Sequence, residues 1–162
     1  MQIVADIQVL ALVAVANTAP LVAKLIFGDR FSRAIDNRTV LWDGQPLFGS
    51  SKTIRGAALS IVATTALAPL VGLAAGIGLF TGISAMVGDL CSSFCKRRFG
   101  VKPSGRATGL DQIPESLLPA LVCQRMLSLS TLDVLAVTAI FFVGEILLSK
   151  VLFKAHLRDR PY

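Results

Sequence analysis

A stretch of 33 residues without one charged side chain, Gly56–Gly88, constrains this chain more than any other feature. As a single helix it would be about 50 Å long, too long for one straight crossing of a hydrocarbon core about 30 Å thick. It is long enough for two crossings only if the second helix continues to about Phe94 and takes Asp89 into the membrane. We therefore expect a hairpin of two helices, over about 57–75 and 78–95.

Glycines mark both the turn of this hairpin and the faces of its helices. We expect the turn near Gly76 and Gly78. Together with Gly72 and Gly82, they provide small residues at about four-residue spacing, which suits the close packing of helices in lipid.

The whole chain is apolar, with 54% hydrophobic and 16% charged residues among 162 and a mean hydropathy of +0.69. Soluble domains carry nearer a quarter charged residues, and disordered chains are far less hydrophobic. We predict an all-α polytopic membrane protein in which residues 1–162 form a single membrane domain. Five transmembrane helices are expected, over about 7–27, 57–75, 78–95, 113–129 and 132–153.

Of the 16 basic residues, all but Arg125 lie in or beside three segments that a five-span chain places on one side of the membrane. These segments are a first loop (about 28–56), a second loop (about 96–112) and the C-terminal tail. The positive-inside rule then predicts an N-terminus outside the cell and a cytoplasmic C-terminus. Both loops would face the cytoplasm from the cell membrane.

The end of the first loop has the composition of an anion site. Small residues that let backbone amides approach an anion stand beside cations, at the start of a helix whose N-terminus also favours negative charge. The spacing is not that of a Walker A loop. Contacts of the same cations with lipid headgroups are the alternative interpretation. The small residues are Gly49, Ser50 and Ser51, and the charge and a further hydroxyl come from Lys52, Thr53 and Arg55.

Four polar residues, Asp89, Ser92, Ser93 and Lys96, share one face of the third predicted helix. A carboxylate inside the membrane is costly unless it is paired, hydrated or bound to a cation, so a functional role for Asp89 is the default hypothesis. Asp111 opens the fourth predicted helix from the same side of the membrane. Mg²⁺ favours one or two carboxylates plus phosphates and water, so the two aspartates would suit it.

Structural ion pairs are the alternative for these intramembrane acids. Asp89 would then pair with Arg125 or Arg55, and Glu145 of the fifth predicted helix is expected to pair with Arg125. Cations beside metal-binding carboxylates, by contrast, describe a polyphosphate site, where nucleotidyl transfer depends mainly on positioning and charge neutralisation.

Three segments, in the same order, resemble motifs of the CTP-dependent cytidylyltransferases that make CDP-diacylglycerol. Gly88–Ser116 contains Gly-Asp-Leu, a Ser, a Lys-Arg, a Lys-x-Ser-Gly and a later Leu-Asp. Ser51–Gly56 is similar to their Ser-x-Lys-Lys-Thr-x-Glu-Gly segment. The short archaeal branch, the CDP-archaeol synthases, is the most similar in length, in the Asp43–Gly56 loop and in the terminal Arg158–Tyr162.

The resemblance implies a Mg²⁺-dependent cytidylyl transfer. CTP would react with 2,3-bis-O-geranylgeranyl-sn-glycerol 1-phosphate to give CDP-archaeol and pyrophosphate in membrane phospholipid biosynthesis. Pro103 and Gln112 depart from the bacterial and eukaryotic motifs in ways that fit the archaeal branch. A small membrane transporter or lipid-binding protein without CTP chemistry is the alternative, but it would not need basic, serine-bearing loops on one face.

The predicted site follows from these motifs. Asp89, Asp111 and Lys96 are the expected catalytic residues, and the two aspartates are the expected ligands of Mg²⁺. No nucleic-acid partner is expected, while an oligomer is possible. The expected substrate contacts are Asp43, Gly44, Ser51, Lys52, Thr53, Arg55, Gly56, Ser92, Ser93, Arg97, Arg98 and Gln112.

Overall fold

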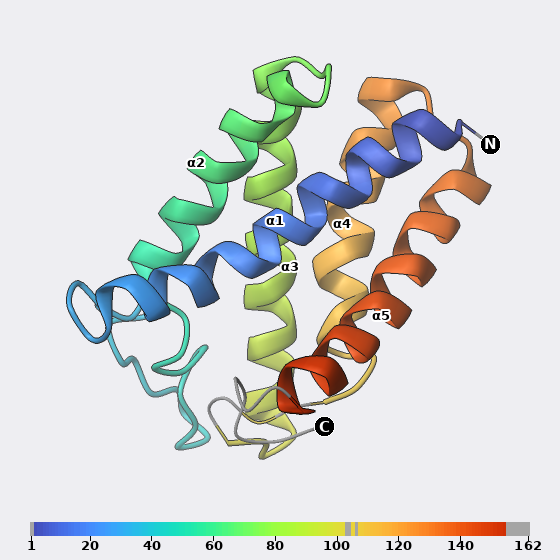
Figure 1. The fold of residues 1–162 in the computed structure, drawn as a ribbon. Coiled ribbons are helices and arrows are strands. Elements are labelled where there is room, and N and C mark those ends of the chain that lie inside the picture. The colour runs from blue at the N-terminus through green and yellow to red at the C-terminus, as the bar shows by residue number, and fades with distance from the viewer. Residues whose placement is uncertain (1, 103–104, 106, 155–162) are drawn as a thin grey trace.

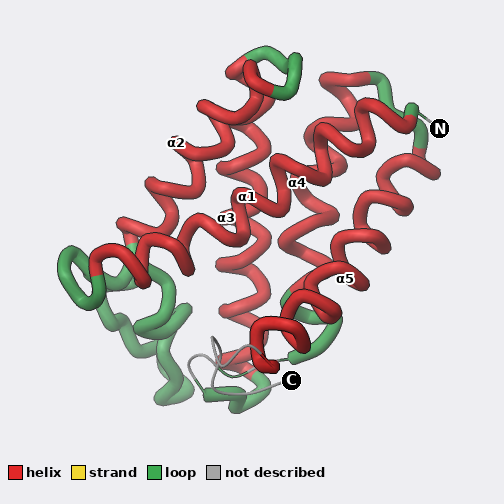
Figure 2. The backbone as a smooth tube through the Cα atoms, viewed as in Figure 1, coloured by secondary structure: helices red, strands yellow, loops and turns green. Residues whose placement is uncertain are grey.

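The chain folds into five helices in the predicted order (Figure 1). The computed structural model describes residues 2–102, 105 and 107–154, so Pro103 and Arg158–Tyr162 lie outside it. Within the described residues no strand forms, only two isolated β-bridges (Figure 2). The all-α class is confirmed. The helices are α1 (Ile3–Phe27), α2 (Ile54–Leu70), α3 (Ala75–Arg98), α4 (Gln112–Leu127) and α5 (Thr131–Lys154).

Three of the helices, α1, α3 and α5, are long and apolar enough to cross a membrane. Helices α2 and α4 have only 17 and 16 residues. At 1.5 Å per residue they are about 25 Å long, less than the roughly 30 Å of hydrocarbon that a full crossing requires. Length and composition therefore support three spans in the described part of the chain, against the five predicted.

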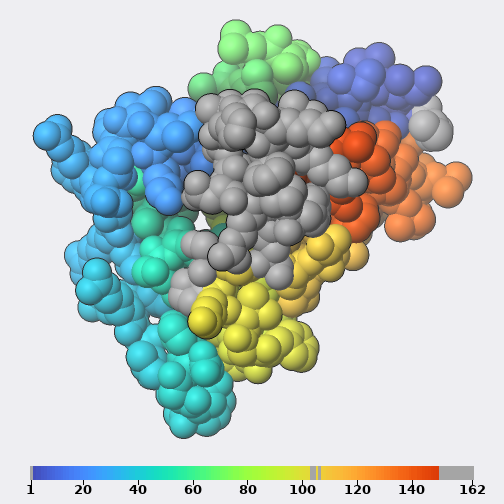
Figure 3. All heavy atoms as spheres, turned by 60° about the horizontal axis from the view of Figure 1, so that its bottom comes forward, coloured from blue at the N-terminus to red at the C-terminus, as the bar shows by residue number. Residues whose placement is uncertain are grey.

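The two long loops lie at the same end of the bundle, the lower end in Figures 1 and 2. The α2–α3 and α4–α5 turns and the N-terminus lie at the opposite end. Helix α1 crosses the other helices obliquely and contacts all four of them. The described residues of both loops are thus brought to one face of the molecule, which Figure 3 turns toward the viewer.

The turn between α2 and α3 is not where the glycine spacing places it. It comprises residues 71–74, and Gly72 adopts the left-handed conformation there with φ +82°. Gly76 and Gly78 lie inside α3 instead. The expected turn near Gly76 and Gly78 was therefore wrong by about one helical turn, because Gly72 makes it earlier.

Close packing of helix α3 is confirmed for two of the predicted glycines. A Cβ atom on Gly78 or Gly82 would collide with Thr64 of α2, whereas one on Gly76 would meet nothing within 4 Å. Gly88, which was not predicted to pack, lies directly against the backbone of Pro114 in α4. Glycine therefore lets α3 approach two neighbouring helices, α2 in its first half and α4 near its middle.

The apolar core occupies the half of the bundle away from the loops. Val9, Leu12 and Val13 of α1 pack there with Cys123 of α4 and Val137 of α5, all of them buried. This arrangement leaves the loop end of the same helices free to carry polar residues.

Candidate active site

A polar cavity opens among the helices on the side of the two loops. Its volume is about 230 Å³, and its walls come from α1, α3, α4, α5, the segment that precedes α2 and the second loop. Two lysines and four carboxyl groups face it, a high density of charge for so apolar a chain. The lining residues are Asn17, Pro20, Ser51, Lys52, Met86, Asp89, Lys96, Gly105, Asp111, Glu115 and Glu145.

Helix α3 places both Asp89 and Lys96 in the wall of this cavity, because residues seven apart lie two turns along one helix face. Asp89 forms an ion pair with Lys52 of the first loop, and Lys96 forms one with Asp111 after the second loop. All four side chains are largely buried, at no more than 20% exposed. The structure thus brings the three predicted catalytic residues together with Lys52.

Asp111 immediately precedes α4, and its side chain makes no capping hydrogen bond to the helix. Its Oδ2 atom accepts a hydrogen bond from the backbone amide of Ala107 at 3.1 Å. Its Oδ1 atom faces the Lys96 ammonium and makes no hydrogen bond with the described residues. One carboxylate oxygen is therefore held by the loop and the other is directed at the cavity.

Two further carboxyl groups in the cavity belong to residues that the sequence analysis did not place in the site. Glu115 follows Asp111 by four positions, which is about one helical turn, and it lines the same cavity as Asp89 and Asp111. The four-residue spacing was the signal that could have identified it. Glu145 of α5 reaches the same cavity.

Neither of the ion pairs expected for Arg125 forms. Arg125 is exposed in the last turn of α4 and lines a separate apolar groove between α3 and α4. Glu145 instead faces the polar cavity, and the lysine partner of Asp89 is Lys52. Arg125 lies at the end of α4 away from the loops, which separates it from both acids.

Asp36 organises the first loop and was also missed. Its buried carboxylate accepts hydrogen bonds from the backbone amides of Arg38, Phe48 and Gly49, each at 2.9 Å. Burial raises the pKa of Asp36, but these amides outweigh it and hold the pKa below its ordinary value. The Ile35 amide also donates to the Lys52 carbonyl at 2.9 Å, so the segment around Asp36 fixes the backbone that carries Lys52.

Asp43 and Arg98 join the first loop to the end of α3, outside the cavity. Their side chains form an ion pair at 2.8 Å, and Arg98 also donates to the Pro46 carbonyl at 2.7 Å. Gly44 follows Asp43 with φ +73°, a conformation that favours glycine in this turn. Figure 3 shows the first loop, in light blue to teal, beside the yellow end of α3.

The other predicted contacts in the first loop surround the start of α2. The Thr53 side chain accepts a hydrogen bond from the Gly56 amide at 3.1 Å and so caps the helix. Arg55 donates to the carbonyls of Gly28 and Arg30 at the end of α1 and does not line the cavity. A small hollow beside the cavity is bordered by Ser51, Thr53 and Gly56. Lys52 and Asp89 line both this hollow and the cavity.

Four predicted contacts near the second loop are buried and do not line the cavity. Ser92 donates to the Asp89 carbonyl, and the Gln112 side chain accepts from the Gly109 amide at 2.8 Å. Ser93 is buried without a hydrogen bond in the described part of the chain. Arg97 is 1% exposed, and its Nε and Nη1 atoms have no partner among the described residues.

The carboxylates partly fit a divalent metal. Asp89 and Asp111 supply the oxygen ligands that Mg²⁺ prefers, and each has a lysine ammonium as its ion-pair partner. No group of three or more His, Cys, Asp or Glu side chains among the described residues is arranged to hold a metal ion. The site therefore fits a metal that takes its remaining ligands from phosphates and water.

Comparisons with known proteins identify the family of this chain. The model of the CarS-like family, described as CDP-archaeol synthase, matches residues 70–162, and that of the cytidylyltransferase family matches residues 11–109. The CDP-archaeol synthase of Sulfurisphaera tokodaii is 30% identical over 79% of this chain and 81% of its own length. That of Aeropyrum pernix is 37% identical over 61% of this chain and 57% of its own.

A solved structure, described as an intramembrane enzyme for archaeal membrane lipid biosynthesis, has the same fold. It superposes with a TM-score of 0.74 and 27% sequence identity, over 88% of this chain and 90% of its own. Family membership favours the enzyme over the transporter or lipid-binding alternative. The chain belongs to the CDP-archaeol synthase family and is a CTP-dependent nucleotidyltransferase of the membrane.

Proposed function

We propose that this protein transfers the cytidylyl group of CTP to 2,3-bis-O-geranylgeranyl-sn-glycerol 1-phosphate, with Mg²⁺ as cofactor, giving CDP-archaeol and pyrophosphate. The observation that supports this most directly is the cavity in which Asp89 and Asp111 face Lys52 and Lys96. Carboxylates for a metal and ammonium groups for phosphates are the two requirements of nucleotidyl transfer.

The reaction is a single in-line displacement. An oxygen of the lipid phosphate attacks the α-phosphorus of CTP and forms a new P–O bond, while the bond to the β-phosphate breaks and its electron pair leaves with pyrophosphate. Lys52 and Lys96 orient and neutralise the phosphate oxygens. Asp89 and Asp111 hold Mg²⁺, which supplies charge stabilisation for the phosphates when it is bound. A phosphate monoester is already largely ionised at neutral pH, so the attack requires no dedicated base.

The remaining predicted residues have roles around this centre in the proposal. Arg97 and Arg98 add positive charge at the end of α3, and Asp43 with Gly44 shapes the loop that faces them. The other proposed substrate contacts are Ser51, Thr53, Arg55, Gly56, Ser92, Ser93 and Gln112.

The orientation in the cell membrane is part of the same proposal. All five helices cross or enter the membrane, the N-terminus faces outward, and both loops face the cytoplasm, where CTP is available. Both loops lie at one end of the bundle, which supports this arrangement (Figure 1).

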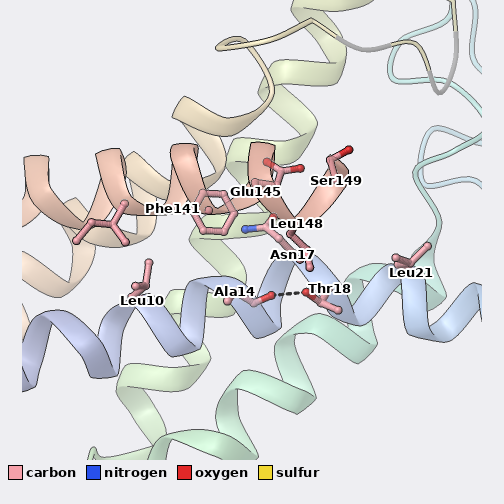
Figure 4. A pocket seen from close by; sticks show the side chains of 11 residues that line it. Leu10, Ala14, Asn17, Thr18, Leu21, Phe141, Glu145, Leu148 and Ser149 are labelled. Atoms are coloured by element: carbon pink, nitrogen blue, oxygen red, sulfur yellow. Dashed lines mark hydrogen bonds between the residues drawn. The ribbon is translucent and has the colours of Figure 1, made fainter. Parts of the chain in front are cut away.

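An apolar groove between α1 and α5 offers a place for the lipid chains. It has a volume of about 290 Å³, and the residues drawn in Figure 4, such as Leu10, Leu21 and Phe141, come from these two helices. Asn17 and Glu145 line both this groove and the polar cavity, so the two spaces meet there. A lipid lying in the groove would have its phosphate at the carboxylates while its chains remain beside the bilayer.

The proposal is tested with purified protein in detergent, labelled CTP, Mg²⁺ and a panel of lipid phosphates. We expect CDP-lipid and pyrophosphate with the isoprenoid-ether phosphate, and loss of both products when EDTA removes the metal. Product formation that persists in EDTA would contradict the metal role. Selective use of an ester-linked phosphatidate would contradict the proposed lipid.

A further inference from the structure

Both carboxylates proposed as metal ligands already have a cation beside them. The Lys52 ammonium is paired with the Asp89 carboxylate, and the Lys96 ammonium with the Asp111 carboxylate. A divalent metal that entered the cavity alone would have to displace these ammonium groups or lie beside them. Since like charges repel strongly in a largely buried site, the two lysines oppose binding of the metal by itself.

Binding of CTP would remove this repulsion between the lysines and the metal. A triphosphate brings several anionic oxygens into the cavity, to which an ammonium displaced from a carboxylate can turn. Lysine suits such an exchange, because its charge sits on a flexible stem and donates in three directions. The carboxylate that each lysine leaves is then available to the metal, whose remaining ligands would be the phosphates.

The two lysines differ in how firmly they are held. The Lys96 side chain is 9% exposed, and its ammonium also donates to the Gly105 carbonyl at 3.3 Å. Asp89 is the only hydrogen-bond partner found for the Lys52 ammonium among the described residues, and the Lys52 side chain is 20% exposed. Lys52 is therefore the lysine freer to move.

We propose that Lys52 and Lys96 serve as resident counter-ions of Asp89 and Asp111 and transfer to the triphosphate when CTP arrives, so that divalent metal and CTP bind cooperatively. This inference rests on the metal role in the proposed function. Because coupling between two ligands is reciprocal, each ligand should raise the affinity for the other by the same factor. A coupling of about 5- to 150-fold is typical of two linked sites.

The test measures binding rather than turnover. Mn²⁺ serves as the metal probe and is titrated into purified protein in detergent, alone and with a CTP analogue that has a methylene group between the α- and β-phosphorus. Binding is followed by the electron paramagnetic resonance of free Mn²⁺ and corrected for the metal–analogue complex formed in solution. Lys52→Gln and Lys96→Gln are compared with wild type, and Arg125→Gln serves as a control with a lost cation outside the site.

Wild type should bind Mn²⁺ weakly alone and at least about 5-fold more tightly with the analogue. Both lysine variants should bind Mn²⁺ alone more tightly than wild type, with the larger coupling loss in Lys52→Gln, and should bind the analogue more weakly. Lys52→Arg keeps the charge and should retain most of the coupling. Thermal unfolding identifies a variant that has lost its fold.

Two outcomes distinguish a failure of the lysine exchange from a failure of the proposed metal-dependent function. If Lys52→Gln and Lys96→Gln fold and bind Mn²⁺ alone no more tightly than wild type, the lysines do not compete with metal and the exchange is wrong. If wild type and all variants fail to bind Mn²⁺ even with the analogue, while CDP-lipid is still made, the metal role of the two aspartates fails as well.

Discussion

The side chains of Lys52 and Asp89 form an ion pair although they are 37 positions apart in the chain. This contact joins the end of the first loop to α3. Seven residues further along α3, Lys96 makes the equivalent contact with Asp111. Helix α3 is therefore the element that joins both loops to one cavity.

Replacement of Asp89 by asparagine tests its catalytic role directly. Asp89→Asn keeps the size of the side chain but removes the charge that would hold Mg²⁺. We expect CDP-lipid formation to fall by on the order of 100-fold or more, the scale on which loss of one electrostatic contact to a transition state is measured. Asp29→Asn, which changes an exposed acid at the start of the first loop, is the matched control. Near-normal turnover by a folded Asp89→Asn protein would exclude the metal role.

Helix periodicity was enough to predict that Asp89 and Lys96 share a face, because that relation is local. The hairpin turn was not predictable in the same way. Gly72, Gly76 and Gly78 can all adopt turn conformations, and the packing of Gly78 against Thr64 of α2 keeps that glycine within α3. The choice among them depends on a neighbouring helix.

Asp36 illustrates the same limit within the site. Two of its three amide partners lie twelve and thirteen residues further along the chain, at Phe48 and Gly49. Nothing in the local sequence distinguishes Asp36 from the exposed Asp29. Glu115, in contrast, was within reach of prediction, since it lies one helical turn after Asp111.

The contacts of Asp36 predict a loop that depends on one carboxylate. Asp36→Asn replaces an acceptor oxygen by an amide nitrogen, which cannot accept from the amides that face it. We expect a loss of about 1–3 kcal/mol in the free energy of unfolding and faster tryptic cleavage of the first loop at Arg38. Both are measured against Asp29→Asn. An unchanged melting temperature with unchanged proteolysis would show that the loop does not need this carboxylate.

The lowered pKa of Asp36 predicts that the loss of unfolding free energy in Asp36→Asn depends on pH. Since the folded protein holds the carboxylate ionised more strongly than the unfolded chain does, this stabilisation is present above the ordinary carboxyl pKa. It is lost as the pH falls through the lowered, folded-state value. The stability difference between wild type and Asp36→Asn should be full near pH 7 and shrink below about pH 4. Thermal unfolding of both proteins across this range measures it, and a difference that is constant down to pH 2 would contradict the assignment.

Glycine at position 88 is predicted to be required by the α3–α4 contact. A Cβ atom there would collide with the backbone of Pro114, which cannot move as a flexible side chain would. Gly88→Ala should therefore lower the free energy of unfolding by about 1–3 kcal/mol. Gly76→Ala places the same methyl group in open space on the same helix and should be neutral or stabilising by up to about 1 kcal/mol. Equal melting temperatures for the two variants would show that α3 and α4 can separate without loss.

Gly144 lines the groove between α1 and α5, and a Cβ atom on it would meet nothing within 4 Å. Gly144→Leu should hinder the lipid chains while leaving the loops and Asp89 unchanged. We expect the KM for the isoprenoid-ether phosphate to rise about tenfold, equivalent to about 1.4 kcal/mol of lost contact, with little change in the KM for CTP. Gly76→Leu adds the same side chain in open space on α3, far along the chain from the groove, and should leave both constants unchanged. A folded Gly144→Leu protein with an unchanged KM for lipid would mean that the chains reach the cavity by another route.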